Sequence, residues 1–475
     1  MKKIFIFCLA TVLSFGVFAN NITVANTSVS GQNTVSHFSM IGFDVTWENS
    51  WRTSTNEQNW DAAWVFVKFR KKGTTSWLHA TFNYAAPGDA VSCGHTPGAG
   101  AFIKTPADGK GVFIYRSNDG FGTANYTGNK LRWNYSADGV LDTDSVEVNV
   151  YACEMVYVKQ GAFYLGSNGS ENGHFRKGNV DSAYLVNSEN AITIGTATGN
   201  LYYQSYSYSG DQQGPIPAAF PKGYNSFYIM KYECSQQQYA DFLNNIDAAR
   251  ATIRNGGPFT GTHPNLIAPF PERAYSNASF DDNAAFSDWS ALRPMSEMEF
   301  EKACRGYNIQ PLPNEFAWGN TTQIDALASN ITNDGTNNEA FSTGNVNFGF
   351  GMGRPVRCGA FATSSTTRTS SGGSYYGAME LSGNVWEFTV TAGTPIGRQF
   401  TGVHGDGYIA ADGRANINIV GTTDANIYGL RGGGFNNSTT SFLSISDRYY
   451  AYYGAATGMN YRTTNYGIRN VRTEQ

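Results

Sequence analysis

The side chains best able to do metal or redox chemistry are cysteines and histidines, and their spacing decides which sites they could form. Beyond residue 19 the cysteines include no C-x-x-C pair: Cys93, Cys153, Cys234, Cys304 and Cys358. A zinc finger or ribbon is therefore unsupported, and an odd number leaves at least one thiol free or paired between chains. The histidines are also scattered: His37, His79, His95, His174, His263 and His404. We expect hydrogen-bonded or surface histidines, not metal ligands.

Segment 447–465 indicates a different chemistry, because it consists almost entirely of Tyr, Ala, Gly, Thr, Asn and Asp. Tyrosine gives a large contact area at low entropy cost, and small polar residues give adaptable hydrogen bonds, as in binding loops. The candidate ligand-binding tyrosines are Tyr449, Tyr450, Tyr452, Tyr453 and Tyr461. Ordinary polar loops share this composition, so a structural loop stays open as the alternative.

The composition excludes several classes of protein. Of the 475 residues, 41% are hydrophobic and 14% aromatic, which is enough to fill a core and excludes global disorder. Charged residues make up 15% and there are 53 glycines, so loops must carry much of the structure. The 33 basic residues are outnumbered by 37 acidic ones and form no basic run. We therefore expect no nucleic-acid partner.

Residues 1–19 are typical of a signal peptide. Lys2 and Lys3 precede an apolar stretch over residues 4–17, and small residues suited to cleavage follow, ending at Ala19. The apolar stretch is shorter than the roughly 20 residues that span a bilayer, and no later run is long enough either. The sequence predicts cleavage after Ala19, no membrane span, and a secreted, periplasmic or cell-surface location.

The elements that position these residues fall into two regions. Residues 20–151 contain short alternating stretches separated by turn clusters, at 38–47, 63–69, 111–115, 131–135 and 146–151. Such alternation is typical of half-buried strands. It predicts an all-β sandwich of the immunoglobulin or fibronectin type, in which no catalytic constellation is evident.

Residues 152–475 have a different pattern, with two predicted amphipathic helices among Gly-, Asn- and Ser-rich stretches. The first begins after Ser235, with Gln238 three residues later; the second begins after Ser296, with Glu299 in the same relation. Both pairs have the spacing of a capping box. Residues 166–225 are polar and lack a period, which indicates loops or an insertion. The fold class predicted for the whole chain is α+β.

Several segments of this second region resemble, in family order, the formylglycine-generating enzymes, also called sulfatase-modifying factors. Their fold is related to that of C-type lectins. The strongest match is MELSGNVWEF at residues 379–388. The other matching segments are 154–158 with 161–167, 227–233, 293–303, 316–320, 430–435 and 467–469. The resemblance implies that residues 152–475 form one loop-rich, C-type-lectin-like domain.

The resemblance also implies a structural calcium ion. In relatives the Gly-Asn-x-Trp-Glu segment helps to hold calcium through backbone oxygens and the glutamate side chain, and hard oxygen donors suit that ion. Carried over to this chain, the metal ligands would be Asn384, the Val385 carbonyl and Glu387. The alternative is that Asn384 and Glu387 only hydrogen-bond to loop backbone.

The catalytic members of the family use copper(I) held by two cysteine thiolates to oxidise a sulfatase cysteine with oxygen. The equivalent positions here are Asn437 and Phe442, neither of which can replace a thiolate. We therefore expect that the protein binds no copper and has no catalytic residue of this type. If it is an enzyme, it works by another route. Other members hold iron through histidines, for which His404 and Asp406 are the local candidates, although the glycines around them favour a turn.

In the lectin-like fold, segment 447–465 lies on the ligand-facing surface. Relatives place residues 431–440, which include Asn437, beside it, so the resemblance implies that the two segments line one surface. The resemblance therefore predicts an exported, non-catalytic protein that binds an extracellular protein or glycan there. Three alternatives remain: a family enzyme with a non-standard site, a structural envelope subunit, or a variable protein of a diversity-generating retroelement. The variable protein is suggested by residues 436–441 and the residues after 447. Asparagine codons altered at adenine encode Ser, Thr, Tyr, Asp, Ala and Gly, and these residue types predominate there.

Overall fold

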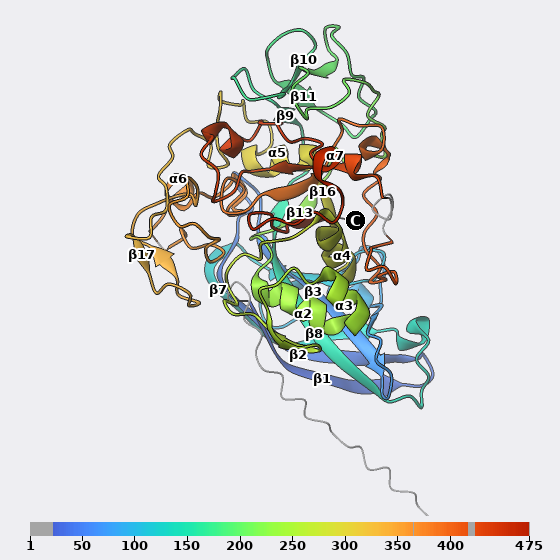
Figure 1. Cartoon of the computed structure of the whole chain (residues 1–475). Helices are drawn as coiled ribbons and strands as arrows, with labels where there is room; N and C mark the ends of the chain where they lie inside the picture. The colour runs from blue at the N-terminus through green and yellow to red at the C-terminus, as the bar shows by residue number, and fades with distance from the viewer. Residues whose placement is uncertain (1–21, 364, 417–422, 475) are drawn as a thin grey trace, which may run out of the picture.

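The computed structural model describes residues 22–363, 365–416 and 423–474 (Figure 1). The predicted signal peptide lies outside them. The fold is α+β, with many strands and few helices, as the sequence predicted. Its main element is a ten-stranded sheet. In spatial order this sheet contains β20 (Tyr428–Arg431), β19 (Glu387–Val390), β16 (Arg293–Ser296), β21 (Asn470–Thr473), β13 (Phe227–Met230), β8 (Val146–Val158), β3 (Asp61–Lys71), β6 (Val112–Arg116) and β5 (Ala101–Lys104), with β4 (Leu78–His79) beside β3.

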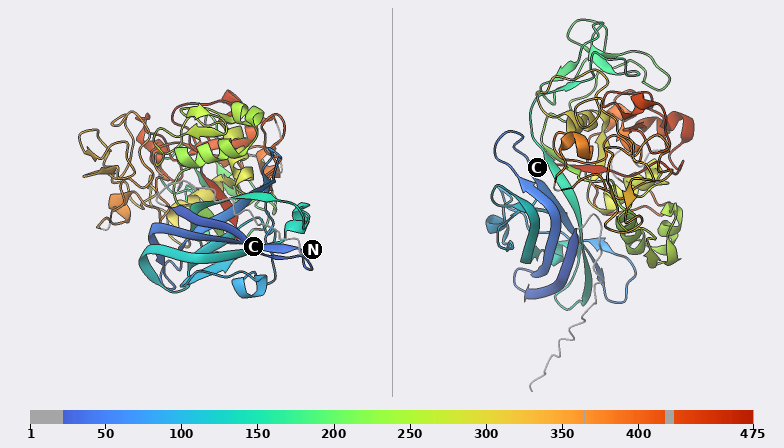
Figure 2. Two further views of the ribbon diagram at one scale, coloured as in Figure 1. Left: turned by 90° about the horizontal axis from the view of Figure 1, so that it is seen from below. Right: turned by 90° about the vertical axis from the view of Figure 1, so that its left-hand side faces the viewer.

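The N-terminal region forms a β-sandwich. Its second sheet has the order β1 (Thr23–Asn33), β2 (Phe38–Arg52) and β7 (Gly120–Trp133), all antiparallel. This sheet faces the part of the large sheet that contains β8, β3, β6 and β5, and side chains of both sheets fill the space between them, among them Trp47, Val65 and Ile114. In the right-hand view of Figure 2 the sandwich is at the lower left.

Strand β3 is buried on both faces, not on one as its alternation predicted. Val65 and Val67 point into the sandwich core, whereas Trp64 and Phe66 point into the core of the following region. This accounts for its nearly continuous run of apolar residues. Strand β8 pairs with β3 on one side and β13 on the other, so the sheet continues across residues 151 and 152.

Both predicted helices are confirmed, with capping boxes at Ser235 and Ser296: α2 (Gln236–Asn245) and α5 (Glu297–Arg305). Two further helices were not predicted, α3 (Ala248–Arg254) and α4 (Phe280–Trp289). The described residues also contain three one-turn α-helices, α1 (Ala90–Cys93), α6 (Arg368–Ser371) and α7 (Gly454–Thr457). Within the described ranges, no helix is long and apolar enough to cross a bilayer.

Residues 166–225 are mostly loops, as predicted, with three short strands. Strand β9 (Phe163–Leu165) pairs with β11 (Tyr184–Val186), and β10 (Phe175–Lys177) pairs with β12 (Leu201–Tyr203). They stand at the top of Figure 1, above the red C-terminal segment. Two small hairpins lie elsewhere: β14 (Thr260–Thr262) with β15 (Asn265–Ile267), and β17 (Ile331–Thr332) with β18 (Ala340–Phe341).

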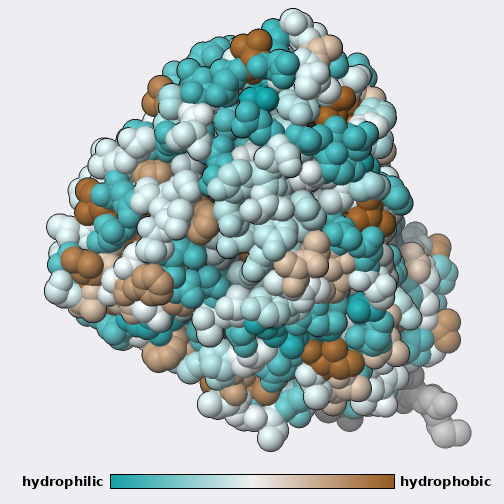
Figure 3. Space-filling view, turned by 45° about the horizontal axis from the view of Figure 1, so that its top comes forward, coloured by the Kyte–Doolittle hydropathy of each residue, from teal (hydrophilic) through white to brown (hydrophobic). Residues whose placement is uncertain are grey.

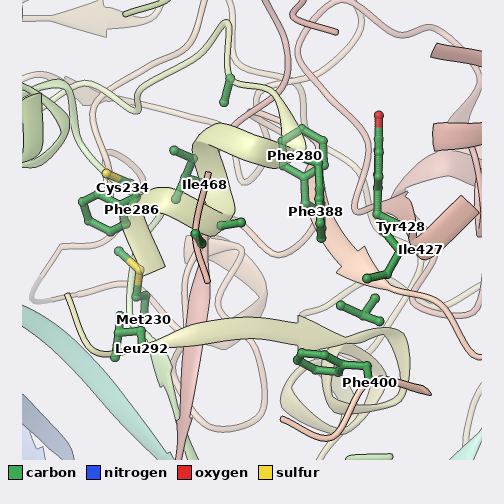
Figure 4. Close-up of a cluster of buried hydrophobic side chains, with 14 of the residues drawn as sticks. Met230, Cys234, Phe280, Phe286, Leu292, Phe388, Phe400, Ile427, Tyr428 and Ile468 are labelled. Atoms are coloured by element: carbon green, nitrogen blue, oxygen red, sulfur yellow. The ribbon is translucent and has the colours of Figure 1, made fainter. Parts of the chain in front are cut away.

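The core of the second region joins α4 to the edge strands of the large sheet. Figure 4 shows Phe280 of α4 beside Phe388 of β19 and Tyr428 of β20, and the rings of Phe280 and Tyr428 stack at 4.6 Å. The cysteines beyond residue 19 are all buried and free. Burial raises the pKa values of the Cys234, Cys304 and Cys358 thiols well above the ordinary value. These thiols are therefore unreactive core residues.

Candidate ligand-binding site

The loop after β20 is anchored from within. Arg431 is 1% exposed and donates hydrogen bonds to Glu301 Oε1 at 2.9 Å and to the Ile445 carbonyl at 3.2 Å. Gly432 and Gly433 have φ values of 88° and 77°, which L side chains rarely adopt. Residues 431–435 are buried, although the resemblance placed this stretch at the surface; residues 436 and 437 are half-buried, and exposure begins at residue 438.

Positions 437 and 442 are engaged in structural contacts. Asn437 Oδ1 accepts a hydrogen bond from the Gly434 amide at 2.9 Å, and the Asn437 carbonyl accepts one from the Gly349 amide at 2.9 Å. The Phe442 ring lies 5.3 Å from Trp386 and 5.5 Å from Tyr449. Asn437 thus closes a turn, and Phe442 packs against aromatic neighbours.

Two of the predicted tyrosines, Tyr449 and Tyr450, contact the ring of Phe442, whereas Tyr461 lies 6.2 Å from Tyr466. Ring centroids are 4.6 Å apart for Tyr449 and Tyr450 and 4.3 Å apart for Tyr450 and Tyr453. Tyr449, Tyr450, Tyr452 and Tyr453 are all half-buried, whereas Tyr461 is 46% exposed. Burial raises the pKa of the Tyr450 phenol to about 12. Burial first, and then the neighbouring Tyr208 and Tyr461, raise the pKa of the Tyr453 phenol.

A second segment, 204–210, completes this aromatic group, and the sequence did not identify it. The ring of Tyr208 lies 5.1 Å from Tyr453 and 5.7 Å from Tyr452, and Tyr206 lies 5.2 Å from Tyr449. The sequence QSYSYSG at 204–210, like segment 447–465, combines tyrosines with small residues, and that likeness was the available signal. We call the exposed and half-buried residues of 204–210 and 436–461 the tyrosine surface; its tyrosines are Tyr206, Tyr208, Tyr449, Tyr450, Tyr452, Tyr453 and Tyr461.

Two buried charged residues, Asp447 and Arg448, anchor the C-terminal segment of the tyrosine surface. Arg448 Nε and Nη2 donate to the two carboxylate oxygens of Glu297, at the start of α5, at 2.7 and 3.0 Å. The Arg448 guanidinium also lies over the Phe175 and Tyr203 rings, at 4.0 and 4.3 Å. Asp447 accepts a hydrogen bond from Asn172 Nδ2 at 2.8 Å, and burial raises its pKa to about 6. The C-terminal segment is thus tied to α5 and to residues 172–203.

The predicted calcium ligands lie in a buried polar layer behind this surface. Asn384 Oδ1 already accepts hydrogen bonds from Asn347 Nδ2 at 2.9 Å and from the Val356 amide at 3.0 Å. The Val385 amide donates to Glu233 Oε1 at 3.0 Å. The Asn384 side chain is therefore held by protein groups.

Glu387 differs from Asn384 because it keeps one oxygen without a hydrogen-bond partner. Its Oε1 accepts from Arg469 Nε at 2.5 Å, whereas its Oε2, like Glu380 Oε2, is buried and unpartnered. Burial raises the pKa values of both glutamates to about 7. Hard carboxylate oxygens of this kind suit calcium. However, nowhere in the described ranges do three or more His, Cys, Asp or Glu side chains form a group that could hold a metal, so the residues fit calcium only in part.

The histidines are hydrogen-bonded and not gathered. His404 Nε2 accepts from the Thr473 amide at 3.0 Å, and burial lowers its pKa well below the ordinary value. His174 contacts the Glu171 carbonyl and Asp181, both at 2.7 Å. The Asp406 amide donates to Asp288 Oδ1 at 2.9 Å, as in a turn. His404 and Asp406 are therefore each used in loop structure.

Comparison with known families matches residues 141–474 to the sulfatase-modifying factor enzyme 1-like domain. The match covers well over half of the chain. Among curated proteins, the chain is similar to hercynine oxygenase of Mycolicibacterium smegmatis, with 28% identity over 113 residues. That alignment covers 24% of this chain and 20% of the other protein, so the chain spans about a fifth of the length of this relative.

Proposed function

The chain belongs to the sulfatase-modifying factor enzyme 1-like domain family, and from this membership we propose that it is an exported, non-catalytic member that binds a ligand on the tyrosine surface. The proposal rests on the identities of the residues at positions 437 and 442, where the catalytic members have cysteines. Copper(I) needs soft thiolate ligands, whereas here an asparagine closes a turn and a phenylalanine supports Tyr449. A binding surface made of tyrosines takes the place of the catalytic thiolates.

Export is part of the proposal and rests on residues 1–19. A basic start, an apolar stretch and a small-residue cleavage site together are typical of secreted proteins. The ligand would then be met outside the cytoplasm, as a protein or a glycan.

A structural calcium ion is a second part of the proposal. Glu387 Oε2 and the Val385 carbonyl would bind it, while Asn384 holds the loop through its hydrogen bonds to Asn347 and Val356. The ion would supply positive charge next to Glu387 and Glu380 and no reaction chemistry. Its role would be to stabilise the fold beneath the tyrosine surface.

The catalytic alternative is tested with the mature chain, residues 20–475, loaded with copper(I) and given a cysteine-containing sulfatase peptide. We expect mass spectrometry to show an unchanged peptide, with a catalytic family member as the positive control. A peptide that has lost its thiol and gained an aldehyde would contradict the non-catalytic assignment.

Ligand binding is tested on an array that carries both identified extracellular proteins and glycans. We expect wild-type binding to at least one feature and at least tenfold weaker binding after Tyr449, Tyr452 and Tyr453 are replaced by alanine. Tyr408→Ala is the matched control, because Tyr408 is 56% exposed outside the tyrosine surface. If the triple variant unfolds, Tyr452→Ala alone serves. Binding unaffected by a folded variant would contradict the proposal.

A further inference from the structure

The exposed side chains of the tyrosine surface carry no charge. The structure describes segments 204–210 and 436–461 in full, and their only ionisable acid and base besides tyrosine, Asp447 and Arg448, are 6% and 0% exposed. Just outside the segments, Asp211 pairs with Arg398 at 2.7 Å, and Arg462 pairs with Asp282 at 2.6 Å. The exposed residues are Gln204, Ser205, Tyr206, Ser207, Ser438, Thr439, Thr440, Ala455, Ala456, Asn460 and Tyr461.

The same surface also lacks aliphatic anchors. Leu443, Ile445 and Met459 are its large aliphatic residues, and all three are buried. Figure 3, in which the top of the molecule is turned forward, shows a face where residues of intermediate hydropathy lie among hydrophilic ones and isolated hydrophobic ones. The buried centre of a protein interface is more apolar than the ordinary surface. The two segments therefore offer rings and small polar side chains at the surface, and no exposed leucine, isoleucine or methionine.

The ring geometry suits a ligand with apolar faces and polar edges. Tyr206 and Tyr449 meet at 63°, and Tyr208 and Tyr453 meet at 86°, so neighbouring rings point their faces in different directions. Tyr206, at 44% exposed, and Tyr461, at 46%, are the most exposed tyrosines of this surface. Tyrosine combines an apolar face with a polar tip, and the exposed serine, threonine and asparagine side chains of the same two segments both donate and accept hydrogen bonds.

We infer that the tyrosine surface binds an uncharged glycan, whose sugar rings pack on Tyr206 and Tyr461 and whose hydroxyls bond to the neutral side chains between them. This inference rests on the proposed ligand-binding function. It adds the chemical class of the ligand. Because no exposed charge takes part, binding is insensitive to salt, which screens interactions between charges.

The experiment uses the mature chain on an array of neutral glycans ending in mannose, glucose, galactose or N-acetylglucosamine, beside sulfated, sialylated and uronic-acid glycans. We expect binding to a neutral glycan, with a Kd that changes less than twofold between 0.05 and 0.5 M NaCl. Tyr206→Ala should raise this Kd at least tenfold. Tyr408→Ala, the matched exposed control, should leave it unchanged, and circular dichroism should show that both variants are folded.

Three results would overturn the inference. These are a preference for charged glycans with a Kd that rises with salt, binding of neutral glycans that Tyr206→Ala does not weaken, and tyrosine-dependent binding to proteins but to no glycan. The third result would leave the proposed ligand-binding function intact. If no feature of either kind shows tyrosine-dependent binding, the proposed function fails together with the inference.

Discussion

The backbone amide of Tyr452 donates a hydrogen bond of 3.0 Å to the carbonyl of Tyr208. This bond joins the C-terminal segment to residues 204–210, and the rings of the same two residues meet edge to face at 5.7 Å. The tyrosine surface is thus a joint between two distant parts of the chain. Its shape depends on both segments, so a substitution in one segment should alter the conformation or protection of the other.

Replacing Tyr208 by alanine should loosen this joint without unfolding the protein. Tyr208 contacts the rings of Tyr450, Tyr452 and Tyr453, and aromatic pairs contribute about 0.5–1.5 kcal/mol each beyond their burial. We expect amide hydrogen exchange at Tyr452 to become at least fivefold faster, while exchange in β3 stays unchanged. Tyr206→Ala, which removes a contact to Tyr449, is the control and should leave the Tyr452 amide protected. Equal exchange rates at Tyr452 in the wild type and in Tyr208→Ala would contradict the role of Tyr208 in joining the two segments.

Breaking the pair of Arg448 and Glu297 should be far more damaging. Both side chains are fully buried, and removing one partner of a buried ion pair costs about 3–5 kcal/mol. Arg431 lies 3.7 Å from the same Glu297 carboxylate and keeps part of the charge compensation, so the lower end of this range, about 3 kcal/mol, applies. We expect Arg448→Met to lower the free energy of unfolding in urea by this amount. Arg70→Met breaks a partly exposed pair with Glu147, and as the control it should cost about 1 kcal/mol or less. Similar losses of unfolding free energy for the two variants would show that Arg448 does not anchor the C-terminal segment of the tyrosine surface.

The sequence predicted those elements whose pattern is local. The spacing of Ser296 and Glu299 was enough to predict the start of α5, because capping depends on neighbouring residues alone. Helix α4 was missed because all its faces are buried, which removes the periodicity that marks an amphipathic helix. Its own capping box, at Ser279 and Asp282, was the local signal that could have found it.

The candidate site was predictable in its composition and not in its assembly. Tyr449 and Tyr452 stood out because tyrosine and small residues are concentrated around them, but their contact with Tyr208 depends on the fold bringing distant segments together. The burial of Arg431 followed from its bond to Glu301 on another element. Such tertiary pairings leave no local trace in a single sequence.

Calcium binding should appear as a gain in stability. A ligand that binds only the folded state stabilises it by about 2.7 kcal/mol at a hundredfold excess over its Kd. We expect EDTA to lower the melting temperature of the wild type, excess calcium to restore it, and Glu387→Gln to respond to neither. Identical melting curves with and without EDTA, for protein shown to be free of metal, would leave Glu387 with only its bond to Arg469.

Glu387 also sets the expected pH dependence of the metal-free protein. Burial raises its folded-state pKa from 4.5 to about 7, so the folded state binds more protons than the unfolded state between these values. The stability that this group contributes is therefore fully present below about pH 4.5 and is lost as the pH rises through about 7. In the metal-free protein, Glu387→Gln should reduce this loss but not remove it, because burial raises the pKa of Glu380 to about 7 as well; urea titrations at pH 5, 6 and 7 would detect the difference. An unchanged slope in the variant would contradict the assignment.

Lys68 should have an effect of the opposite sign at higher pH. Its ammonium is buried, with Nζ 2.9 Å from His79 Nδ1, and it faces Asp288, Asp406 and Lys110. Burial lowers its pKa from 10.5 to about 7, so between these values the unfolded state binds more protons than the folded state. Stability from this group is present above pH 10.5 and is lost as the pH falls through about 7.

The measurement compares unfolding in urea at pH 7, 8, 9 and 10 for the wild type and for Lys68→Met, which keeps the length of the side chain without its charge. We expect the free energy of unfolding of the wild type to rise with pH more steeply than that of the variant, because the difference between the two isolates Lys68 from other buried lysines. Lys71→Met is the matched control on the same strand, since its ammonium is partly exposed beside Asp144, and it should keep the wild-type slope. Parallel curves for wild type and Lys68→Met would mean that the ammonium stays charged in the folded state, held by Asp288 and Asp406.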